Sequence, residues 1–357
     1  MDLATFAGEV AAVDAVQLPV ALGAFDCRNN RLAYLGLMQD GFADAVEAAS
    51  RKYGAQRIGV LLGTSTSGIL QTELEYRRCD PDSGALPADF MYGSTHNPFS
   101  VTDFTRQYFG LGGPAVVVSS ACSSSAKVFA SARRMMAAGL IDAAVVGGVD
   151  SLCLTTLYGF NSLGLISSQA CRPFDVARDG ISIGEAAAFV LLEPMPAQLD
   201  DSAVLLLGVG ESSDAHHMSS PHPEGLGARM AMQDALKTAS LDAAEIDYIN
   251  LHGTATPSND AAETKAVAAV FGSGTPCSST KGATGHTLGA AGGLEAVICA
   301  LALQHGLLPG GLNTQQLDPA LPLNYLLDNR AQPICRVLSN SFGFGGTNCS
   351  LIFGRAG

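Results

Sequence analysis

The segment Val116–Ala126 most constrains the fold, because it joins a buried strand to a helix through a very tight turn. Val116–Val118 are three β-branched residues in a row, which is typical of a buried strand. Small residues follow, and from Cys122 the apolar spacing is helical until Gly139. Strands that alternate with helices, with both faces buried, predict parallel α/β sheets.

Cys122 lies at the turn between that strand and that helix. Backbone N–H groups and the helix dipole favour an anion at this point, so we expect a lowered thiol pKa and a nucleophilic cysteine. The alternative is that Cys122 fills the core, as most cysteines do. The nine cysteines show no CxxC or zinc-site spacing, which favours a reducing compartment and a cytoplasmic location.

Length and charge exclude some classes of protein. A chain of 357 residues suggests two domains or two fused halves. Its 20 basic residues against 33 acidic ones give a net charge of −13, which argues against nucleic acid as a partner. We find no targeting segment and no apolar run of ~20 residues, so we expect no membrane span.

The second half of the chain repeats the element order of the first. The strand Ile58–Leu62, which runs into glycine and hydroxyl residues, has a counterpart in Tyr248–Leu251. Two later strands, Ala143–Val149 and Ala187–Leu192, correspond to Arg336–Asn340 and Cys349–Phe353. We therefore predict two duplicated halves, divided as residues 1–197 and 198–357. Helical spacing also predicts a helix over Leu32–Tyr53.

Three glycine-rich loops follow predicted strands of the second half, where α/β sheets bind ligands. They span residues 251–260, 279–292 and 339–348. The first two carry His252 and His286, and Lys281 stands five residues before His286. Neutral imidazoles that donate Nε2–H would stabilise an oxyanion or enolate beside a thioester. A lone histidine is more often a core or surface residue, and Lys281 could be a solvated surface residue.

The third loop contains Phe344 between glycines. We expect it to move, or to bring a backbone N–H against a ligand, and the alternative is a turn with Phe344 in the core. His216, His217 and His222 form a separate cluster that could suggest a metal. Their spacing and the lack of nearby carboxylate pairs make a metal site the weaker interpretation, so we expect none.

Four motifs in this order resemble the elongating type I/II β-ketoacyl-acyl-carrier-protein synthases. They are Ser-Ser-Ala-Cys122-Ser, the segment from His252 to Pro257, the segment from Lys281 through His286 to Gly292, and the segment from Asn340 to Asn348. The resemblance covers about residues 55–357. It implies a thiolase-like fold, in which two duplicated halves form five layers, αβαβα, and a dimer with itself or with a ketosynthase-like homologue.

The same resemblance implies a reaction and roles for residues. Cys122 would hold an acyl thioester taken from acyl carrier protein, and malonyl-carrier protein would lose carbon dioxide and condense with it, without a cofactor. By the same resemblance, His252 and His286 would stabilise the enolate, and Lys281 would have a structural or electrostatic role. Cys122, Phe344 and Gly345 would form the oxyanion hole and the gate. The substrate pocket would be lined by Phe342, Thr254, Thr256 and His217.

The sequence departs from the family at its start. The resemblance implies an opening strand that ends in Thr-Gly-x-Gly and becomes central in the first half, and no such motif is present. Either the chain starts late, after that strand, or residues 1–25 replace it. Serine-rich segments resemble ketosynthases of specialised bacterial pathways, such as those for aryl polyenes. The alternative function is a partner subunit resembling a chain-length factor, either non-catalytic or limited to acyl transfer, which the presence of Cys122 disfavours.

Overall fold

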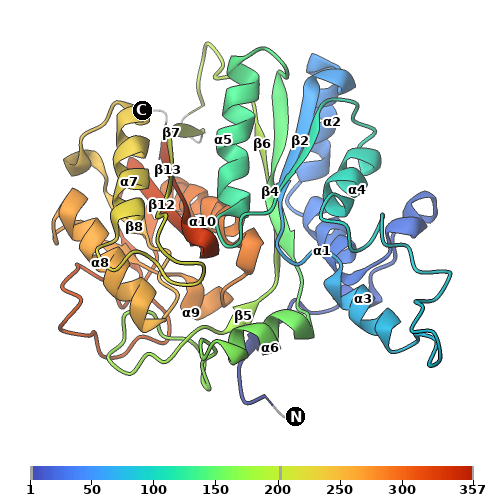
Figure 1. The fold of residues 1–357 in the computed structure, drawn as a ribbon. Helices are drawn as coiled ribbons and strands as arrows, with labels where there is room; N and C mark the ends of the chain where they lie inside the picture. The colour runs from blue at the N-terminus through green and yellow to red at the C-terminus, as the bar shows by residue number, and fades with distance from the viewer. Residues whose placement is uncertain (1–2, 201–202, 356–357) are drawn as a thin grey trace.

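The computed structural model describes residues 3–200 and 203–355, which form two large β-sheets with a layer of helices between them (Figure 1). The first sheet has the strand order β3 (Ala115–Val118), β2 (Ile58–Gly63), β4 (Ala143–Asp150), β6 (Ala186–Leu192). The second has the order β7 (Val204–Ser213), β13 (Thr347–Arg355), β12 (Arg336–Gly343), β8 (Tyr248–Asn250), β9 (Cys277–Ser278).

Helices complete five layers. The central layer is α5 (Ser124–Ala137) and α10 (Ala291–His305), which lie between the sheets and bury apolar residues against both of them. The outer layer on the first sheet is α1 (Arg28–Leu37), α2 (Phe42–Tyr53) and α4 (Ser100–Tyr108), and that on the second sheet is α7 (Leu226–Ala239) and α8 (Pro257–Phe271). The predicted thiolase-like αβαβα arrangement is therefore confirmed.

Shorter elements connect these layers. Three of them are the α-helices α3 (Ile69–Tyr76), α6 (Leu154–Ser162) and α9 (Lys281–Thr284). Six more among the described residues are short 3-10 helices, η1 (Val13–Ala15), η2 (Val20–Phe25), η3 (Ala55–Arg57), η4 (Ala243–Glu245), η5 (Leu288–Ala290) and η6 (Phe344–Gly346). Two short strand pairs are β1 (Ala7–Gly8) with β5 (Ile183–Gly184), and β10 (Leu307–Leu308) with β11 (Arg330–Ala331).

The two halves share one topology. The order β3-β2-β4-β6 matches β9-β8-β12-β13, and the last strand of each series runs antiparallel to its neighbour. The second sheet adds β7, which lies at its edge against β13. Nothing occupies the equivalent place beside β6 among the described residues, because residues 3–25 contribute only the two-residue β1, which pairs with β5.

This comparison corrects two expectations. The first strand that the resemblance implies would not be central, because β7, which holds the equivalent place in the second half, lies at a sheet edge. The predicted helix over 32–53 is two helices, because Asp40 and Gly41 both have a positive φ, 52° and 72°, and end the helical path.

A further correction concerns apolar segments. By length and composition alone, Leu288–His305 is apolar enough to cross a membrane, and the sequence analysis did not single it out. Most of that segment is α10, and 61% of it is buried inside the protein, between the two sheets. The structure therefore accounts for its hydropathy as that of a core helix.

The start of α5 is held close to the first sheet by glycine. A Cβ at Gly63 would lie 2.3 Å from the backbone N of Ser125 and 2.5 Å from the carbonyl carbon of Ser124. Only a residue without a side chain lets β2 and the helix approach this closely.

We predict that Gly63→Ala destabilises the protein by about 1–3 kcal/mol, because the added methyl group must push the first turn of α5 away from the sheet. Urea unfolding measures this change. Gly23→Ala is the matched control, since nothing lies within 4 Å of a Cβ built there. Equal stability of the two variants would contradict the close approach.

Candidate active site

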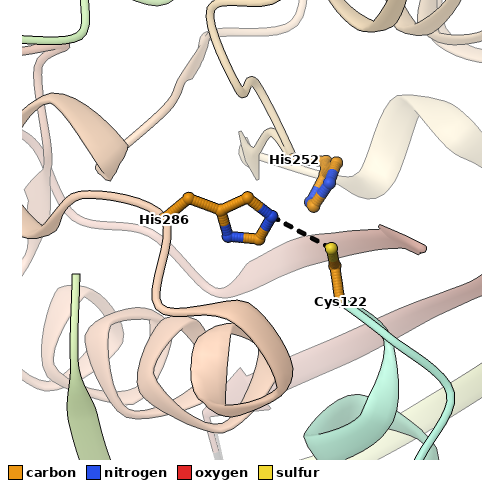
Figure 2. A group of neighbouring side chains, drawn as sticks. All are labelled: Cys122, His252 and His286. Atoms are coloured by element: carbon orange, nitrogen blue, oxygen red, sulfur yellow. Dashed lines mark hydrogen bonds between the residues drawn. The ribbon is translucent and has the colours of Figure 1, made fainter. Parts of the chain in front are cut away.

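Cys122 stands on a sharp turn between β3 and α5. The residue before it, Ala121, has φ 53°, a conformation that costs a non-glycine residue roughly 1 kcal/mol or more. Ser123 then precedes the first residue of α5. This turn directs the sulfur of Cys122 toward loops of the second half, where Figure 2 shows it facing His252 and His286.

His286 lies 3.0 Å from that sulfur, measured from Nε2 to Sγ. The other ring nitrogen, Nδ1, accepts a hydrogen bond of 3.3 Å from the backbone N–H of Leu288. A neutral imidazole carries one proton, so an accepting Nδ1 leaves the proton on Nε2. His286 therefore presents Nε2–H to the sulfur, as the sequence analysis expects.

His252 follows β8 and is fixed by a buried carboxylate. Glu263 of α8 accepts hydrogen bonds of 2.8 Å from the backbone N–H groups of both His252 and Gly253. Asn340 donates a third bond of 3.2 Å to the same carboxylate. The His252 and His286 rings lie at nearly a right angle, with centroids 5.4 Å apart.

Glu263 was missed by the sequence analysis, which described its region only as a loop up to Asp260. A signal was present, since Thr256 and Pro257 form a helix start, and Thr256 accepts a bond from the Asn259 N–H. An acidic residue two turns into such a helix can reach back to the loop that precedes it.

Lys281 is buried beside both imidazoles. Its Nζ donates to a carboxylate oxygen of Glu295 on α10 and lies 3.4 Å from Nδ1 of His252. A cation at Nδ1 favours the tautomer in which His252 carries its proton on Nε2. The alternative of a solvated surface position for Lys281 is wrong, because the side chain is 1% exposed.

Burial sets the protonation of the three reactive groups. It lowers the pKa of both His252 and His286 well below the usual range, and the nearby Lys281 cation lowers them further. Burial also raises the pKa of the Cys122 thiol to about 11, although Lys281 and the backbone N–H of Phe344 oppose the rise. The expected lowering of the thiol pKa is therefore wrong for this closed site, because desolvation outweighs the favourable groups.

Two backbone N–H groups, those of Phe344 and of Cys122 itself, stabilise negative charge on the sulfur. The N–H of Gly345 has another partner, the carbonyl oxygen of Met218 at 2.7 Å. Gly345 has φ 78°, so the loop turns sharply just after Phe344.

A small cavity adjoins these groups. It holds about 50 Å³, enough for a few water molecules but not for an acyl chain. Its lining includes Phe342, Thr254 and Thr256, and also Phe160, whose ring lies 5.4 Å from that of Phe344. Phe160 could not be identified from the sequence, because α6 carries no motif.

His217 does not line this cavity, and its placement in the substrate pocket is wrong. Its side chain is exposed, and Nδ1 accepts a hydrogen bond of 3.2 Å from the backbone N–H of Ser219. The same surface segment contributes Asp214, Ser219, Ser220 and Pro221 to the cavity instead.

The site contains three side chains of a kind that can bind a metal ion, namely Cys122, His252 and His286. Their ligand atoms all lie within 4.8 Å of one another, so we tested whether they fit a metal. Zinc would need both imidazoles to offer an unprotonated nitrogen. The partners of the two Nδ1 atoms leave protons on both Nε2 atoms, and the Lys281 cation lies beside His252. The donor set therefore suits an anion better than a cation.

Family models match both halves of the chain. The model described as Beta-ketoacyl synthase, N-terminal domain, matches residues 35–197, and the one described as Beta-ketoacyl synthase, C-terminal domain, matches residues 203–315. Fold and site thus define a thiolase-like condensing acyltransferase. The chain belongs to the β-ketoacyl synthase family.

The relatives of this chain include proteins named 3-oxoacyl-[acyl-carrier-protein] synthase. The mitochondrial protein of Arabidopsis thaliana is 40% identical over 69% of this chain, and the match spans 57% of that relative, less than two thirds of its length. Synthase 2 of Coxiella burnetii is 34% identical over 84% of this chain and 76% of its own length.

Solved structures of ketosynthases are also similar to this chain, and two of them illustrate the similarity. One is a ketosynthase in complex with its chain length factor from Xenorhabdus doucetiae, with a TM-score of 0.90 and 42% identity over 98% of this chain and 86% of that chain. The other is a β-ketoacyl synthase from Burkholderia phymatum, with a TM-score of 0.86 and 32% identity over 95% of this chain and 85% of that chain.

We predict that alkylation of Cys122 by iodoacetamide accelerates about tenfold per pH unit from pH 7 to pH 10, because the thiolate is the nucleophile and its pKa is about 11. Peptide mass mapping separates this cysteine from the exposed Cys335. An alkylation rate that levels off near pH 7 would contradict the conclusion that burial raises the pKa of the Cys122 thiol.

Proposed function

We propose that this protein is a β-ketoacyl-acyl-carrier-protein synthase, which extends a fatty-acid, polyene or polyketide chain by two carbons. The observation that carries the proposal is a buried thiol facing two neutral imidazoles whose Nε2 atoms carry protons. These groups suit a reaction that transfers an acyl group to sulfur and then generates an enolate beside it.

In the first step, the sulfur of Cys122 attacks the thioester carbonyl of an acyl-carrier protein as a thiolate, and the bond between that carbonyl and the carrier's sulfur breaks. The proton that Cys122 gave up ends on the departing carrier thiol. Negative charge develops on the carbonyl oxygen, where the N–H groups of Cys122 and Phe344 act as the oxyanion hole. The Lys281 cation assists by favouring the thiolate. The acyl group then remains on Cys122 as a thioester.

In the second step, malonyl-carrier protein loses carbon dioxide, and the two electrons of the broken bond form an enolate. The Nε2–H groups of His252 and His286 donate hydrogen bonds to the enolate oxygen. Its carbon attacks the acyl thioester, the bond to Cys122 sulfur breaks, and the thiolate is restored. A buried site protects the enolate from protonation by water.

Phe344 acts as a gate in this proposal. The resting cavity of about 50 Å³ is too small for an acyl chain, so the Phe344 loop must move for substrate to enter. Gly345 and Gly346, with φ of 78° and 74°, give the loop the backbone freedom for such a movement.

The proposed partners are acyl carrier protein and a second ketosynthase-like subunit, either a copy of this chain or a homologue. The similarity to a ketosynthase in complex with its chain length factor supports a specialised pathway, of which aryl polyene synthesis is our candidate. Strand β3 offers a half-buried, apolar sheet edge for the subunit contact. Nine free cysteines support a cytoplasmic location.

Carrier proteins are acidic, so docking needs basic groups. Five arginines are candidates, namely Arg77, Arg78, Arg106, Arg133 and Arg134. Arg78, Arg106 and Arg134 already form ion pairs with neighbouring carboxylates. Arg77 and Arg133 are exposed, and we favour these two as the docking groups.

We predict that incubation with acyl-carrier proteins adds one acyl mass to the protein and none to Cys122→Ala, because the sulfur is the acceptor. Intact-protein mass spectrometry measures the gain. Cys335→Ala is the matched control and should load normally, since this exposed cysteine lies outside the cavity. If Cys122→Ala gained an acyl group, the assignment of Cys122 as the nucleophile would be wrong. If the parent protein gained none from any donor, even with a homologue added, the proposed function would be wrong.

We also predict that His252→Ala lowers malonyl-dependent carbon dioxide release by about a hundred- to a thousandfold, the usual effect of removing a hydrogen-bond donor to a developing oxyanion. Acyl loading should be nearly retained, because His286 is the imidazole in contact with the sulfur. His305→Ala, on the exposed end of α10, is the control. If loading and decarboxylation fell equally, His252 would not act on the enolate selectively.

A further inference from the structure

Asp150 is a buried carboxyl group that the proposed reaction steps do not use. It is the last residue of β4 and is 0% exposed. Among the described residues, the groups that bond to it are hydroxyl and backbone N–H donors rather than cations. Burying a carboxyl group without a cation is costly, so these bonds must offset its lost hydration. They fix the backbone of two separate segments, residues 64–66 and Gly289.

The first segment is the turn that follows β2. Oδ1 of Asp150 accepts bonds from Oγ1 of Thr64 at 2.7 Å and from Oγ1 of Thr66 at 2.9 Å. It also accepts the backbone N–H groups of Ser65 and Thr66, at 2.8 and 2.9 Å. Each threonine hydroxyl in turn accepts a backbone N–H from another residue, which leaves its own proton for Asp150. The whole turn is therefore held by one carboxyl oxygen.

The second segment is η5, which begins two residues after His286. Oδ2 of Asp150 accepts the backbone N–H of Gly289 at 2.5 Å. A Cβ at Gly289 would lie 2.6 Å from Oγ of Ser65 and 2.7 Å from Oδ2, so the two segments meet at the carboxylate. Leu288, directly before Gly289, donates its N–H to Nδ1 of His286. Asp150 thus holds the peptide group next to the donor that sets the His286 tautomer.

Both segments lead to a residue with a left-handed backbone. Leu288 has φ 54°, and Ala121, directly before Cys122, has φ 53°. Ser65, whose N–H is held by Asp150, donates its hydroxyl to the carbonyl oxygen of Ala121 at 3.2 Å. Such conformations are unfavourable for residues with a side chain and persist only where the surrounding structure enforces them. Bonds that start at one carboxylate reach both strained positions.

We propose that Asp150 is a positioning residue of the active site. Its carboxylate holds the turn before Cys122 and the turn after His286 in their left-handed conformations. The distance of 3.0 Å between Sγ and Nε2 depends on both turns. The inference deepens the proposed function and rests on it for its catalytic meaning, because this alignment serves acyl loading and enolate formation. The alternative is that Asp150 only satisfies buried N–H groups of the core.

The main test is Asp150→Asn, which keeps the size of the side chain and one accepting oxygen. The amide oxygen can still bond to residues 64–66, but the NH2 group then faces the N–H of Gly289 and cannot accept it. We expect Leu288 to relax and its N–H to leave Nδ1, so that His286 no longer keeps its proton on Nε2 alone. NMR of the full chain with isotope-labelled histidine distinguishes the tautomers, and His286→Ala assigns the signals. An unchanged tautomer in folded Asp150→Asn would overturn the proposal.

Alkylation of Cys122 by iodoacetamide at fixed pH separates alignment from charge. Asp150 raises the pKa of this thiol, so loss of its charge alone would speed alkylation. A loosened fold would also speed it, by exposing the sulfur. Loss of the bond from His286 disfavours the thiolate, so we expect alkylation of Asp150→Asn to slow about tenfold. An equal or faster rate would contradict the positioning role.

Neither measurement needs a substrate, so each decides the positioning role even if acyl loading contradicts the proposed function. Asp175→Asn is the matched control. This carboxyl group is also buried and accepts backbone N–H groups, but it lies outside the active-site cavity. Its loss should change neither the His286 tautomer nor the alkylation of Cys122. If it changed both as Asp150→Asn does, the effects would be those of any lost buried carboxylate, and the proposal would fail.

Ser65→Ala keeps the proposal testable if Asp150→Asn does not fold. It removes the hydroxyl bond to the carbonyl oxygen of Ala121, where a serine hydroxyl of α5 still donates. Alkylation of Cys122 should slow by about two- to tenfold, the effect of one ordinary hydrogen bond. The imidazole tautomer should be kept, because the bond to Gly289 is intact. An unchanged alkylation rate would show that the turn before Cys122 does not depend on this connection, and the proposal would be wrong.

Discussion

The buried ion pair between Lys281 and Glu295 controls the chemistry of the site. Removing both charges from water is costly, and the pair persists because each group has the other as its partner. The resulting cation acts on all three reactive residues. It lowers the pKa of His252 and His286 and opposes the effect of burial on the Cys122 thiol. Burial and this one charge together keep both imidazoles neutral, and the charge also favours the sulfur anion.

The active site also requires that the two halves of the chain are held in a fixed position relative to each other. Cys122 comes from the first half, and the imidazoles come from the second. The backbone N–H of His286 donates to Ser182 at 2.7 Å, and its carbonyl accepts from Gly184 at 3.0 Å, so first-half residues hold a second-half histidine. Small residues at the start of α5 and α10 bring the layers close together. The distance of 3.0 Å between His286 and the sulfur follows from this packing.

The sequence allowed the fold and the positions of the main site residues to be predicted, because these depend on local patterns. The valine run before Cys122 and the glycine-rich loops around His252 and His286 have recognisable spacing. The thiol pKa could not be predicted, because it depends on how completely distant segments cover the sulfur. Glu263 was missed for a similar reason, since its role arises only when α8 packs against the His252 loop. The break at Asp40 and Gly41 was missed because apolar spacing continues across it.

Among the described residues, the unpaired edge of β6 and the reactive cysteine lie in the same half, yet the fold keeps them apart. Cys122 follows β3, and two strands, β2 and β4, separate β3 from β6. The close packing that supports the nucleophile involves Gly63 on β2 and Gly148 on β4, both near Ser125. None of these contacts uses the free edge of β6. The position of Cys122 therefore depends on β2, β4 and the start of α5 rather than on β6.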